Sequence, residues 1–249
     1  MDDALALGNA AGMKFNWLNT GAFTLLVQTR ITRPGLPIRV YIEGDGFAYV
    51  NRWQPAIDPS PINPVALRLA AVDTSANIAW VARPCQYVML AQIQDDCPQQ
   101  YWTTHRMSPD VVAALGDALS KIAKGGKIEL VGYSGGGAAA VLLAARRSDV
   151  INLRTVAGNL DLEAFARYHK LAPMRNSLDA NSVADRVRHL PQLHFVGGKD
   201  EVVPPELQYT FINRIGEAGE SVTVASADHH KGWGEAWPVL LQRHFPNKH

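Results

Sequence analysis

Hydrophobic and polar positions along this chain show two patterns, one typical of strands and one typical of helices, and the two patterns alternate. Short apolar or β-branched runs bounded by glycine and proline predict strands, at residues 23–31, 38–43, 78–83, 128–133, 153–157, 193–197 and 222–225. Between them lie segments with the apolar spacing of helices, at residues 63–72, 108–124, 135–147, 161–169, 181–188, 204–218 and 233–245. This alternation predicts an α/β fold, a mostly parallel central sheet with helices on both faces.

The pattern gives no reason to divide the chain. It contains no internal repeat, low-complexity segment or linker, and 249 residues suit one α/β domain. We therefore predict a single domain over residues 1–249, in which residues 1–22 form an N-terminal extension. The helix 108–124 has the clearest ends, with Ser108 as N-cap, Pro109 in the first turn and Gly125-Gly126 as the stop.

Composition narrows the classes of partner. Hydrophobic residues make up 47% of the chain, charged residues 19%, and the net charge is +1. These values exclude general disorder and give no basic excess for nucleic acid. The longest apolar stretch, residues 138–145, is far shorter than the roughly 20 residues that span a bilayer. The expected partner is a small molecule, and a monomer is the default expectation.

A Gly-x-Ser-x-Gly motif marks a candidate nucleophile. Ser134 stands in the run GYSGG, directly after the predicted strand 128–133 and before the helix 135–147. A sharp turn of this type strains the serine backbone and exposes its hydroxyl at the helix N-terminus. The alternative is a glycine-rich turn with an incidental serine.

A serine nucleophile needs a base, and the base needs an orienting acid. Asp200 lies 66 residues after Ser134, just past the predicted strand 193–197. Sites in open α/β sheets form at the carboxyl ends of strands, which makes Asp200 the candidate acid. The competing acids are Asp161, after the strand 153–157, and Glu201.

Two adjacent histidines, His229 and His230, follow the last predicted strand. Adjacent side chains diverge, so only one of them can bond both the serine and the acid, and the pattern leaves the choice open. A metal site is disfavoured because no third ligand stands at a recognisable spacing. The other six histidines are placed less well for a base: His105, His169, His189, His194, His244 and His249.

Acyl transfer also needs two N–H donors for the developing oxyanion. One is expected from Gly135, which follows the nucleophile. The second is expected in the loop EGDGF after the strand 38–43, where Asp45 is the first choice and Gly46 the next. The alternative is a plain glycine turn.

Eight blocks of this sequence together resemble a bacterial group of α/β-hydrolases, several of which have lipoprotein leaders. The blocks are VYIEGDG, NPVALRLA, ARPCQY, YWTTHR, LVGYSGGGA, VAGNLD, HFVGGKDEVVPP and DHHKGW, and they cover most of the chain from Phe23 to Trp237. GYSGGG and GGKDEVVPP are typical of the superfamily, and ARPCQY and YWTTHR of the group. The chain departs from the superfamily's common His-Gly opening of the oxyanion loop, because Glu43-Gly44 stands there.

The resemblance implies a serine hydrolase with the triad Ser134, Asp200 and His229, and it does not fix a substrate. We expect an esterase or related acyl hydrolase that uses no cofactor. The group's pattern of Asp-His with a nearby tryptophan falls on Asp228, His229 and Trp233. The resemblance therefore favours His229 as the base. His230 is then expected to support the base from behind or to lie at the rim of the pocket. Peptidase, thioesterase and acyltransferase activities use the same triad and stay open, as does a non-catalytic interaction protein that kept the fold.

Little chain is left for a lid over the site. Residues 158–191, between two predicted strands, number 34 and must carry a connecting helix. We expect no large lid and an open site, which suits short or bulky exposed esters. Phe47, Trp53 and Trp233 are candidates for lining the acyl pocket, and plain packing is the alternative for each.

Two cysteines, Cys85 and Cys97, flank one polar loop. They are either two reduced thiols or a disulfide that marks an oxidising compartment. The resemblance to a group with exported members favours the disulfide, a periplasmic or extracellular location and a lipid anchor in the full-length precursor. The alternative is the cytoplasm, since the first residues show no signal-peptide pattern.

Overall fold

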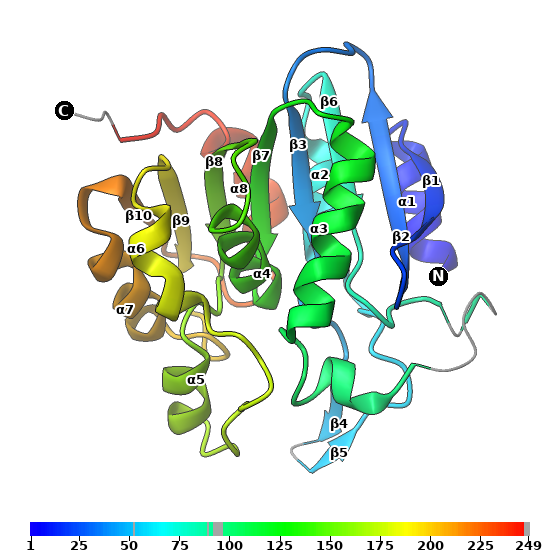
Figure 1. The fold of residues 1–249 in the computed structure, drawn as a ribbon. Coiled ribbons are helices and arrows are strands. Elements are labelled where there is room, and N and C mark those ends of the chain that lie inside the picture. The colour runs from blue at the N-terminus through cyan, green and yellow to red at the C-terminus, as the bar shows by residue number, and fades with distance from the viewer. Residues whose placement is uncertain (52, 89, 92–96, 247–249) are drawn as a thin grey trace.

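The computed structural model describes residues 1–51, 53–88, 90–91 and 97–246. An eight-stranded sheet lies at its centre, in the order β1-β2-β6-β3-β7-β8-β9-β10 (Figure 1). Its strands are β1 (Lys14–Asn19), β2 (Thr24–Ile31), β3 (Ile38–Ile42), β6 (Asn77–Val81), β7 (Ile128–Tyr133), β8 (Val150–Val156), β9 (Gln192–Gly197) and β10 (Gly219–Val224). All neighbours from β6 to β10 in this order pair in parallel, whereas β2 is antiparallel to both β1 and β6. The prediction of a mostly parallel sheet is confirmed.

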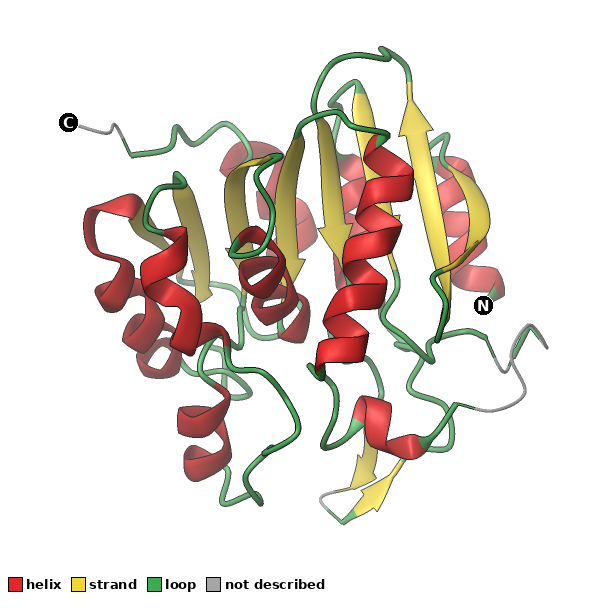
Figure 2. Ribbon diagram, viewed as in Figure 1, coloured by secondary structure: helices red, strands yellow, loops and turns green. Residues whose placement is uncertain are grey.

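Helices cover both faces of the sheet (Figure 2). One face packs against α3 (Pro109–Ala123), α4 (Gly135–Ala144), α6 (Ala184–Val187) and α7 (Pro205–Ile215). The other face packs against α1 (Asp2–Ala10), α2 (Val65–Val72) and α8 (Trp233–Leu240). The strands β6 and β9 are buried at every position, as expected for strands covered on both sides.

The strongest predicted helix has the expected ends. Ser108 caps α3, and its hydroxyl accepts a hydrogen bond from the Val111 N–H at 3.4 Å. The helix stops at Lys124, whose backbone is left-handed with φ 48°, and Gly125 follows with φ +86°. A lysine therefore takes the left-handed position that the sequence pattern suggested for the glycines.

Two elements near the N-terminus were not predicted from the sequence pattern. Residues 1–22, predicted as an extension, form α1 and the edge strand β1, which pairs with β2 along all six of its residues. The helix α1 buries only Ala4 and Gly8, so its apolar periodicity is weak. The Gln28 amide fixes it by donating to the Ala4 carbonyl at 2.9 Å, a contact across 24 residues that no local pattern reveals.

Smaller differences concern the loops that follow β3 and β8. A two-stranded hairpin, β4 (Tyr49–Asn51) and β5 (Gln54–Pro55), follows β3 and was not predicted. Between β8 and β9 the chain holds α5 (Leu162–Tyr168), a 3-10 turn (Ala180–Val183) and α6. The predicted helix 181–188 is thus split, and the described part of this segment contains no large lid. No helix among the described residues has the length and apolar character needed to cross a membrane.

A disulfide joins Cys85 to Cys97, with the two Cα atoms 5.7 Å apart. Both cysteines are buried, at 0% and 6% exposure. Replacing both with alanine is expected to lower the free energy of unfolding by about 3 kcal/mol, because the bond limits the entropy of the unfolded chain. Urea unfolding of the variant and of the wild type measures this difference.

Reduced wild-type protein is the control for this prediction, since it loses the bond but keeps both sulfur atoms in the core. A similar loss in the reduced protein assigns the effect to the cross-link. Mass spectrometry of non-reduced, alkylated protein gives a direct check, and two free thiols in oxidised protein would contradict the bond.

Candidate active site

Ser134 lies at the junction of β7 and α4, in the turn that the motif predicts. Its backbone has φ 51° and ψ −122°, a combination that costs a residue with a side chain free energy. The Ser134 N–H donates to the Val156 carbonyl at 2.9 Å, and its own carbonyl accepts from Gly137 at 2.9 Å. The strained turn is therefore anchored on both sides, and it directs the hydroxyl away from the sheet.

The glycines that flank this turn are required by close contacts. A Cβ atom on Gly132 would lie 2.3 Å from the Gly136 carbonyl oxygen. A Cβ on Gly136 would lie 2.3 Å from the Ile42 carbonyl oxygen of the neighbouring strand. Glycine at both positions lets α4 start directly against β7 and β3.

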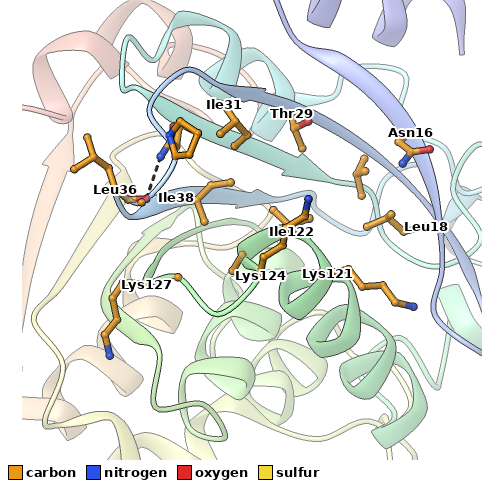
Figure 3. Close-up of a pocket in the computed structure, with 16 residues that line it drawn as sticks. Asn16, Leu18, Thr29, Ile31, Leu36, Ile38, Lys121, Ile122, Lys124 and Lys127 are labelled. Atoms are coloured by element: carbon orange, nitrogen blue, oxygen red, sulfur yellow. Dashed lines mark hydrogen bonds between the residues drawn. The ribbon is translucent and has the colours of Figure 1, made fainter.

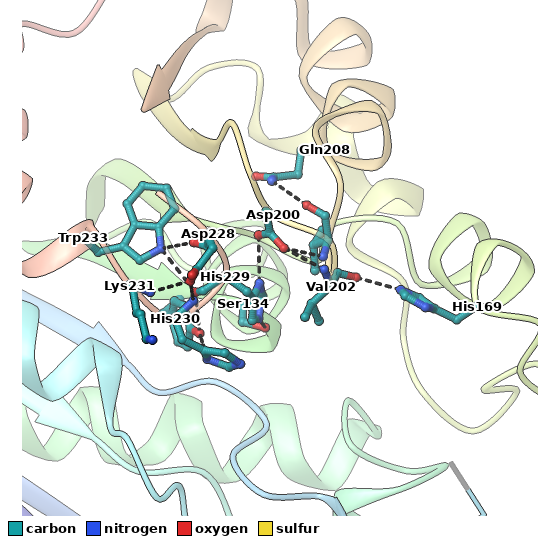
Figure 4. A network of polar contacts seen from close by, with 12 residues as sticks. Ser134, His169, Asp200, Val202, Gln208, Asp228, His229, His230, Lys231 and Trp233 are labelled. Carbon is teal, nitrogen blue, oxygen red and sulfur yellow. Dashed lines mark hydrogen bonds and ion pairs between the residues drawn. The ribbon is translucent and has the colours of Figure 1, made fainter. Parts of the chain in front are cut away.

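Asp200 and His229 meet Ser134 at the carboxyl end of the sheet (Figure 4). The His229 imidazole lies between them, with Nε2 3.0 Å from Ser134 Oγ and Nδ1 2.8 Å from Asp200 Oδ2. A carboxylate only accepts hydrogen bonds, so Nδ1–H is the donor to Asp200 and neutral Nε2 accepts from the serine hydroxyl. Three side chains from loops after β7, β9 and β10 thus form one hydrogen-bonded line.

The acid of this line is itself held in place. Asp200 is 3% exposed, and its Oδ1 accepts from the N–H groups of Val202 and Val203 at 2.9 and 2.8 Å. One carboxylate oxygen is therefore fixed by backbone, and the other faces the imidazole. Asp161, the competing acid, instead caps α5 and accepts from Ala164 N–H at 2.8 Å. Glu201 is exposed.

The loop that carries the base is fixed by three neighbours. Asp228 Oδ1 accepts from the N–H groups of His230 and Lys231, both at 2.7 Å, which closes a tight turn. Tyr133 Oη donates to the His229 carbonyl at 2.9 Å. The indole of Trp233 donates to the Asp228 carbonyl at 2.9 Å. These bonds leave the His229 ring as the one that points at Ser134.

His230 takes a different place. Its Nδ1 lies 3.1 Å from Tyr133 Oη, and the residue lines the hollow in front of the serine. Partial burial and the neighbouring His229 lower the pKa of the His230 imidazole below its usual value, so the neutral ring is favoured. Of the other histidines, His194 is fully buried in β9, and its Nδ1 lies 2.8 Å from Thr155 Oγ1.

The loop after β3 runs directly past the serine. A Cβ on Gly44 would lie 3.3 Å from Ser134 Cβ. Within the described chain, no acceptor is recorded for the N–H groups of Asp45, Gly46 or Gly135. These are the three amides that the sequence predicts as oxyanion donors, and that role stays a prediction.

Glu43 stands where the superfamily commonly has histidine, and its carboxylate is completely buried. It accepts from Trp80 Nε1 at 3.0 Å, from Gly44 N–H at 3.0 Å, and from the Ala66 and Leu67 N–H groups that begin α2, at 3.3 Å each. Burial raises the pKa of this carboxyl, and the four donors oppose that rise. Glu43 therefore joins the oxyanion loop to the N-terminus of α2.

A hollow of about 560 Å³ opens in front of Ser134 and His229. Phe47 lines it, as predicted, together with further apolar side chains, among them Tyr49, Ile62, Phe165 and Val202. The other two predicted lining residues lie elsewhere. Trp53 is 82% exposed on the hairpin, and Trp233, the first residue of α8, is 1% exposed in the core. Sequence alone cannot tell a pocket tryptophan from one in the core or on a hairpin.

Asn159 and Arg106 are among the polar residues that line the hollow and were not predicted as site residues. Asn159 is 3% exposed, and its N–H donates to the Ser134 carbonyl at 3.1 Å. Arg106 is 7% exposed and contacts the carboxylate of Asp45. The sequence blocks VAGNLD and YWTTHR contain them, but neither block carries a motif of known chemistry.

A second hollow, of about 530 Å³, lies at the opposite end of the sheet (Figure 3). Its lining combines apolar side chains such as Leu18, Ile38 and Ile122 with Lys121, Lys124 and Lys127. These residues come from β1, from the C-terminal end of α3, from the start of β3 and from the position just before β7, whereas Ser134 follows the end of β7. This hollow is therefore separate from the candidate active site.

No protein-family model and no curated protein matches the sequence. Solved structures match over nearly the whole chain. An alpha-beta serine hydrolase homologue from Coxiella burnetii has a TM-score of 0.61 at 19% identity, covering 91% of this chain and 93% of its own. Est1E from Butyrivibrio proteoclasticus has a TM-score of 0.64 at 14% identity, with 91% and 97% covered. The esterase domain of a Rhodothermus marinus protein has a TM-score of 0.59 at 15% identity, with 92% and 95% covered.

Each of these likenesses covers at least 91% of this chain. They show the α/β-hydrolase fold for this chain, as the sequence resemblance predicted. The residues in that site are then interpreted from their own geometry.

Proposed function

We propose that this protein is a serine hydrolase that cleaves carboxylic esters through an acyl-enzyme on Ser134. The observation that carries the proposal is the hydrogen-bonded line from Ser134 Oγ to His229 Nε2 at 3.0 Å, and from His229 Nδ1 to Asp200 Oδ2 at 2.8 Å. A nucleophile, a base and an orienting acid in this order are the parts that acyl transfer needs.

The first half of the reaction forms the acyl-enzyme. Ser134 Oγ attacks the ester carbonyl while its proton passes to His229 Nε2. Asp200 stabilises the resulting imidazolium through Nδ1–H and stays ionised. The carbonyl oxygen becomes an oxyanion that accepts from the Gly135 N–H and from the N–H of Asp45 or Gly46. Collapse of this intermediate breaks the C–O bond, and His229 gives its proton to the leaving alcohol.

The second half releases the acid. A water molecule takes the place of the alcohol, gives its proton to His229 Nε2 and attacks the acyl carbonyl. The same two amides hold the second oxyanion, and the Ser134 oxygen leaves with the proton from the imidazolium. The donors, the base and the nucleophile thereby return to their starting state.

The hollow in front of Ser134 supports an ester with an apolar acyl group. Its walls carry Phe47, Ile62, Phe165 and Val202, and the described segment between β8 and β9 adds no large lid. A hollow of about 560 Å³ holds a short or medium acyl chain together with a bulky alcohol. Peptidase, thioesterase and acyltransferase activities remain the alternatives on the same three residues.

We also propose that the protein works in an oxidising compartment outside the cytoplasm. The Cys85–Cys97 disulfide supports this location, because such bonds persist in oxidising compartments and are rare in the cytosol. Mass spectrometry of alkylated protein isolated from the native organism tests both the bond and the location. A disulfide in that protein would support an oxidising compartment.

Labelling with a fluorophosphonate tests the class of function. The wild type is expected to gain one covalent phosphonyl group on Ser134, found by mass spectrometry of the peptide. A panel of nitrophenyl esters of increasing acyl length, matched with an anilide and a thioester, then identifies the substrate class. We expect the ester to have the highest kcat/KM. A protein that neither labels nor hydrolyses any member of the panel would favour the non-catalytic interaction protein.

A further inference from the structure

Two sequence blocks typical of the resembling group, ARPCQY and YWTTHR, have no role in the mechanism above. The structure brings both of them to the loop EGDGF, which follows β3. ARPCQY supplies Arg83 and Gln86, and YWTTHR supplies Arg106. The two arginines share one target, the carboxylate of Asp45.

Asp45 is held between two arginines. Its Oδ1 accepts from Arg83 Nη1 at 3.1 Å, and its Oδ2 accepts from Arg106 Nη1 at 2.9 Å. The two arginines are joined as well, since Arg83 Nη2 donates to the Arg106 carbonyl. Arg106 Nε donates to the Thr103 carbonyl at 2.9 Å. The carboxylate thus has one fixed partner on each oxygen, and neither arginine can turn without breaking a second bond.

Further bonds fix the backbone on the other side of Asp45. Gln86 Nε2 donates to the Gly44 carbonyl at 3.0 Å, and Gln86 Oε1 accepts from the Arg83 N–H at 2.9 Å. Cys85, between these two residues, is bonded to Cys97. The peptide unit that carries the Asp45 N–H is therefore held from both of its ends.

The carboxylate lies very close to the start of α4. A Cβ placed on Gly135 would lie 2.3 Å from Asp45 Oδ1. An uncompensated carboxylate at this place would repel the negative charge that develops on a substrate carbonyl bound to the Gly135 N–H. The two guanidinium groups bonded to the carboxylate compensate its negative charge beside that carbonyl.

The two arginines also favour the ionised form of Asp45. Burial acts to raise the pKa of the Asp45 carboxyl, but Arg106 and Arg83 outweigh burial and hold the pKa below its usual value. Asp45 is therefore ionised throughout the working range of a hydrolase.

We propose that Arg83 and Arg106 are positioning residues of the oxyanion hole: through the Asp45 carboxylate they fix the amide that receives the oxyanion, and they compensate the negative charge of that carboxylate. This proposal rests on the proposed function, because an oxyanion forms only if Ser134 is acylated. Under this proposal the blocks ARPCQY and YWTTHR affect kcat, and they do not contribute to binding of the substrate before the reaction.

Arg106→Gln and Arg106→Lys test the proposal. Glutamine removes the charge, and we expect kcat for an activated ester to fall about 100-fold while KM changes little, since the loss is felt mainly in the transition state. Lysine keeps the charge but cannot bond Asp45 and Thr103 together, so its kcat is expected to lie above that of the glutamine variant and below that of the wild type, by up to about tenfold. A boronic acid, which forms a tetrahedral anion on the serine, should lose affinity in step with kcat.

Arg147→Gln is the matched control. Arg147 pairs with Asp149 at 2.6 Å after α4, at the end of the sheet away from Ser134, and it is similarly shielded. We expect this variant to lose stability at most, with kcat and boronate affinity unchanged.

Two outcomes would overturn the proposal. One is a folded Arg106→Gln enzyme with the kcat of the wild type, and the other is a lysine variant no faster than the glutamine variant. If Arg106→Gln does not fold, Arg106→Lys decides alone: a lower kcat at constant KM supports the proposal, and an unchanged kcat overturns it. Failure of the proposed function is a distinct result, because the wild type itself would then neither label nor hydrolyse esters.

Discussion

Ser134→Ala is expected to lower kcat by about 10⁴- to 10⁶-fold and to abolish fluorophosphonate labelling. The substitution removes the nucleophile of the hydrogen-bonded line and leaves the oxyanion amides and the hollow intact. KM for an activated ester should therefore change little. Stopped assays at high enzyme concentration measure the residual rate, and the variant should show no burst of acyl-enzyme formation.

Stability separates this loss from misfolding. Alanine keeps the Cβ atom of Ser134 and the same strained φ of 51°, so the free energy of unfolding should stay near that of the wild type. Ser134→Gly is a second control, because glycine adopts positive φ without strain. It should be equally inactive and at least as stable as the wild type. Ester hydrolysis that persists in folded Ser134→Ala protein would refute the proposed nucleophile.

His229→Ala and His230→Ala are expected to differ in kcat by at least about 10³-fold. His229 lies within 3.0 Å of Ser134 Oγ and 2.8 Å of Asp200 Oδ2, so its loss removes both proton transfers. The recorded polar contact of the His230 ring is with Tyr133 Oη at 3.1 Å. Its loss should lower kcat less than about tenfold.

Each variant is first compared with the wild type by circular dichroism and thermal unfolding, and then assayed on the same short-chain ester. Labelling adds a second readout, because a serine without its base reacts slowly with a fluorophosphonate. A dead His230 variant beside an active His229 variant would reverse the assignment of the base and leave the hydrolase proposal in place.

Much of the sheet was predictable because its central strands carry their signal locally. β6 and β9 are buried at every residue, which gives each of them a continuous apolar run. The turn at Ser134 is recognisable from its glycines, because close backbone contacts leave no room for a Cβ atom at Gly132 and Gly136. β1 and α1 gave no such signal, since their place depends on pairing with β2 and on the Gln28 contact with Ala4. Elements stabilised by partners far along the chain leave only a weak local pattern.

The sequence by itself determined which loops approach one another. Ser134, Asp200 and the histidine pair each follow a strand of one parallel sheet, and the carboxyl ends of such strands gather at one edge. Chain order and strand position were therefore sufficient to predict the group of residues, whereas the choice of His229 over His230 rested on resemblance.

Only the tertiary structure decided how these residues are held and what surrounds them. The tight turn at Asp228 points His229 at the serine, Trp53 and Trp233 lie outside the hollow, and Asp45 meets arginines 38 and 61 residues away. Side-chain direction and contacts at such separations depend on the packing of the whole sheet and its helices. A local pattern of residues carries neither, because the same short sequence can face the core, the solvent or a ligand.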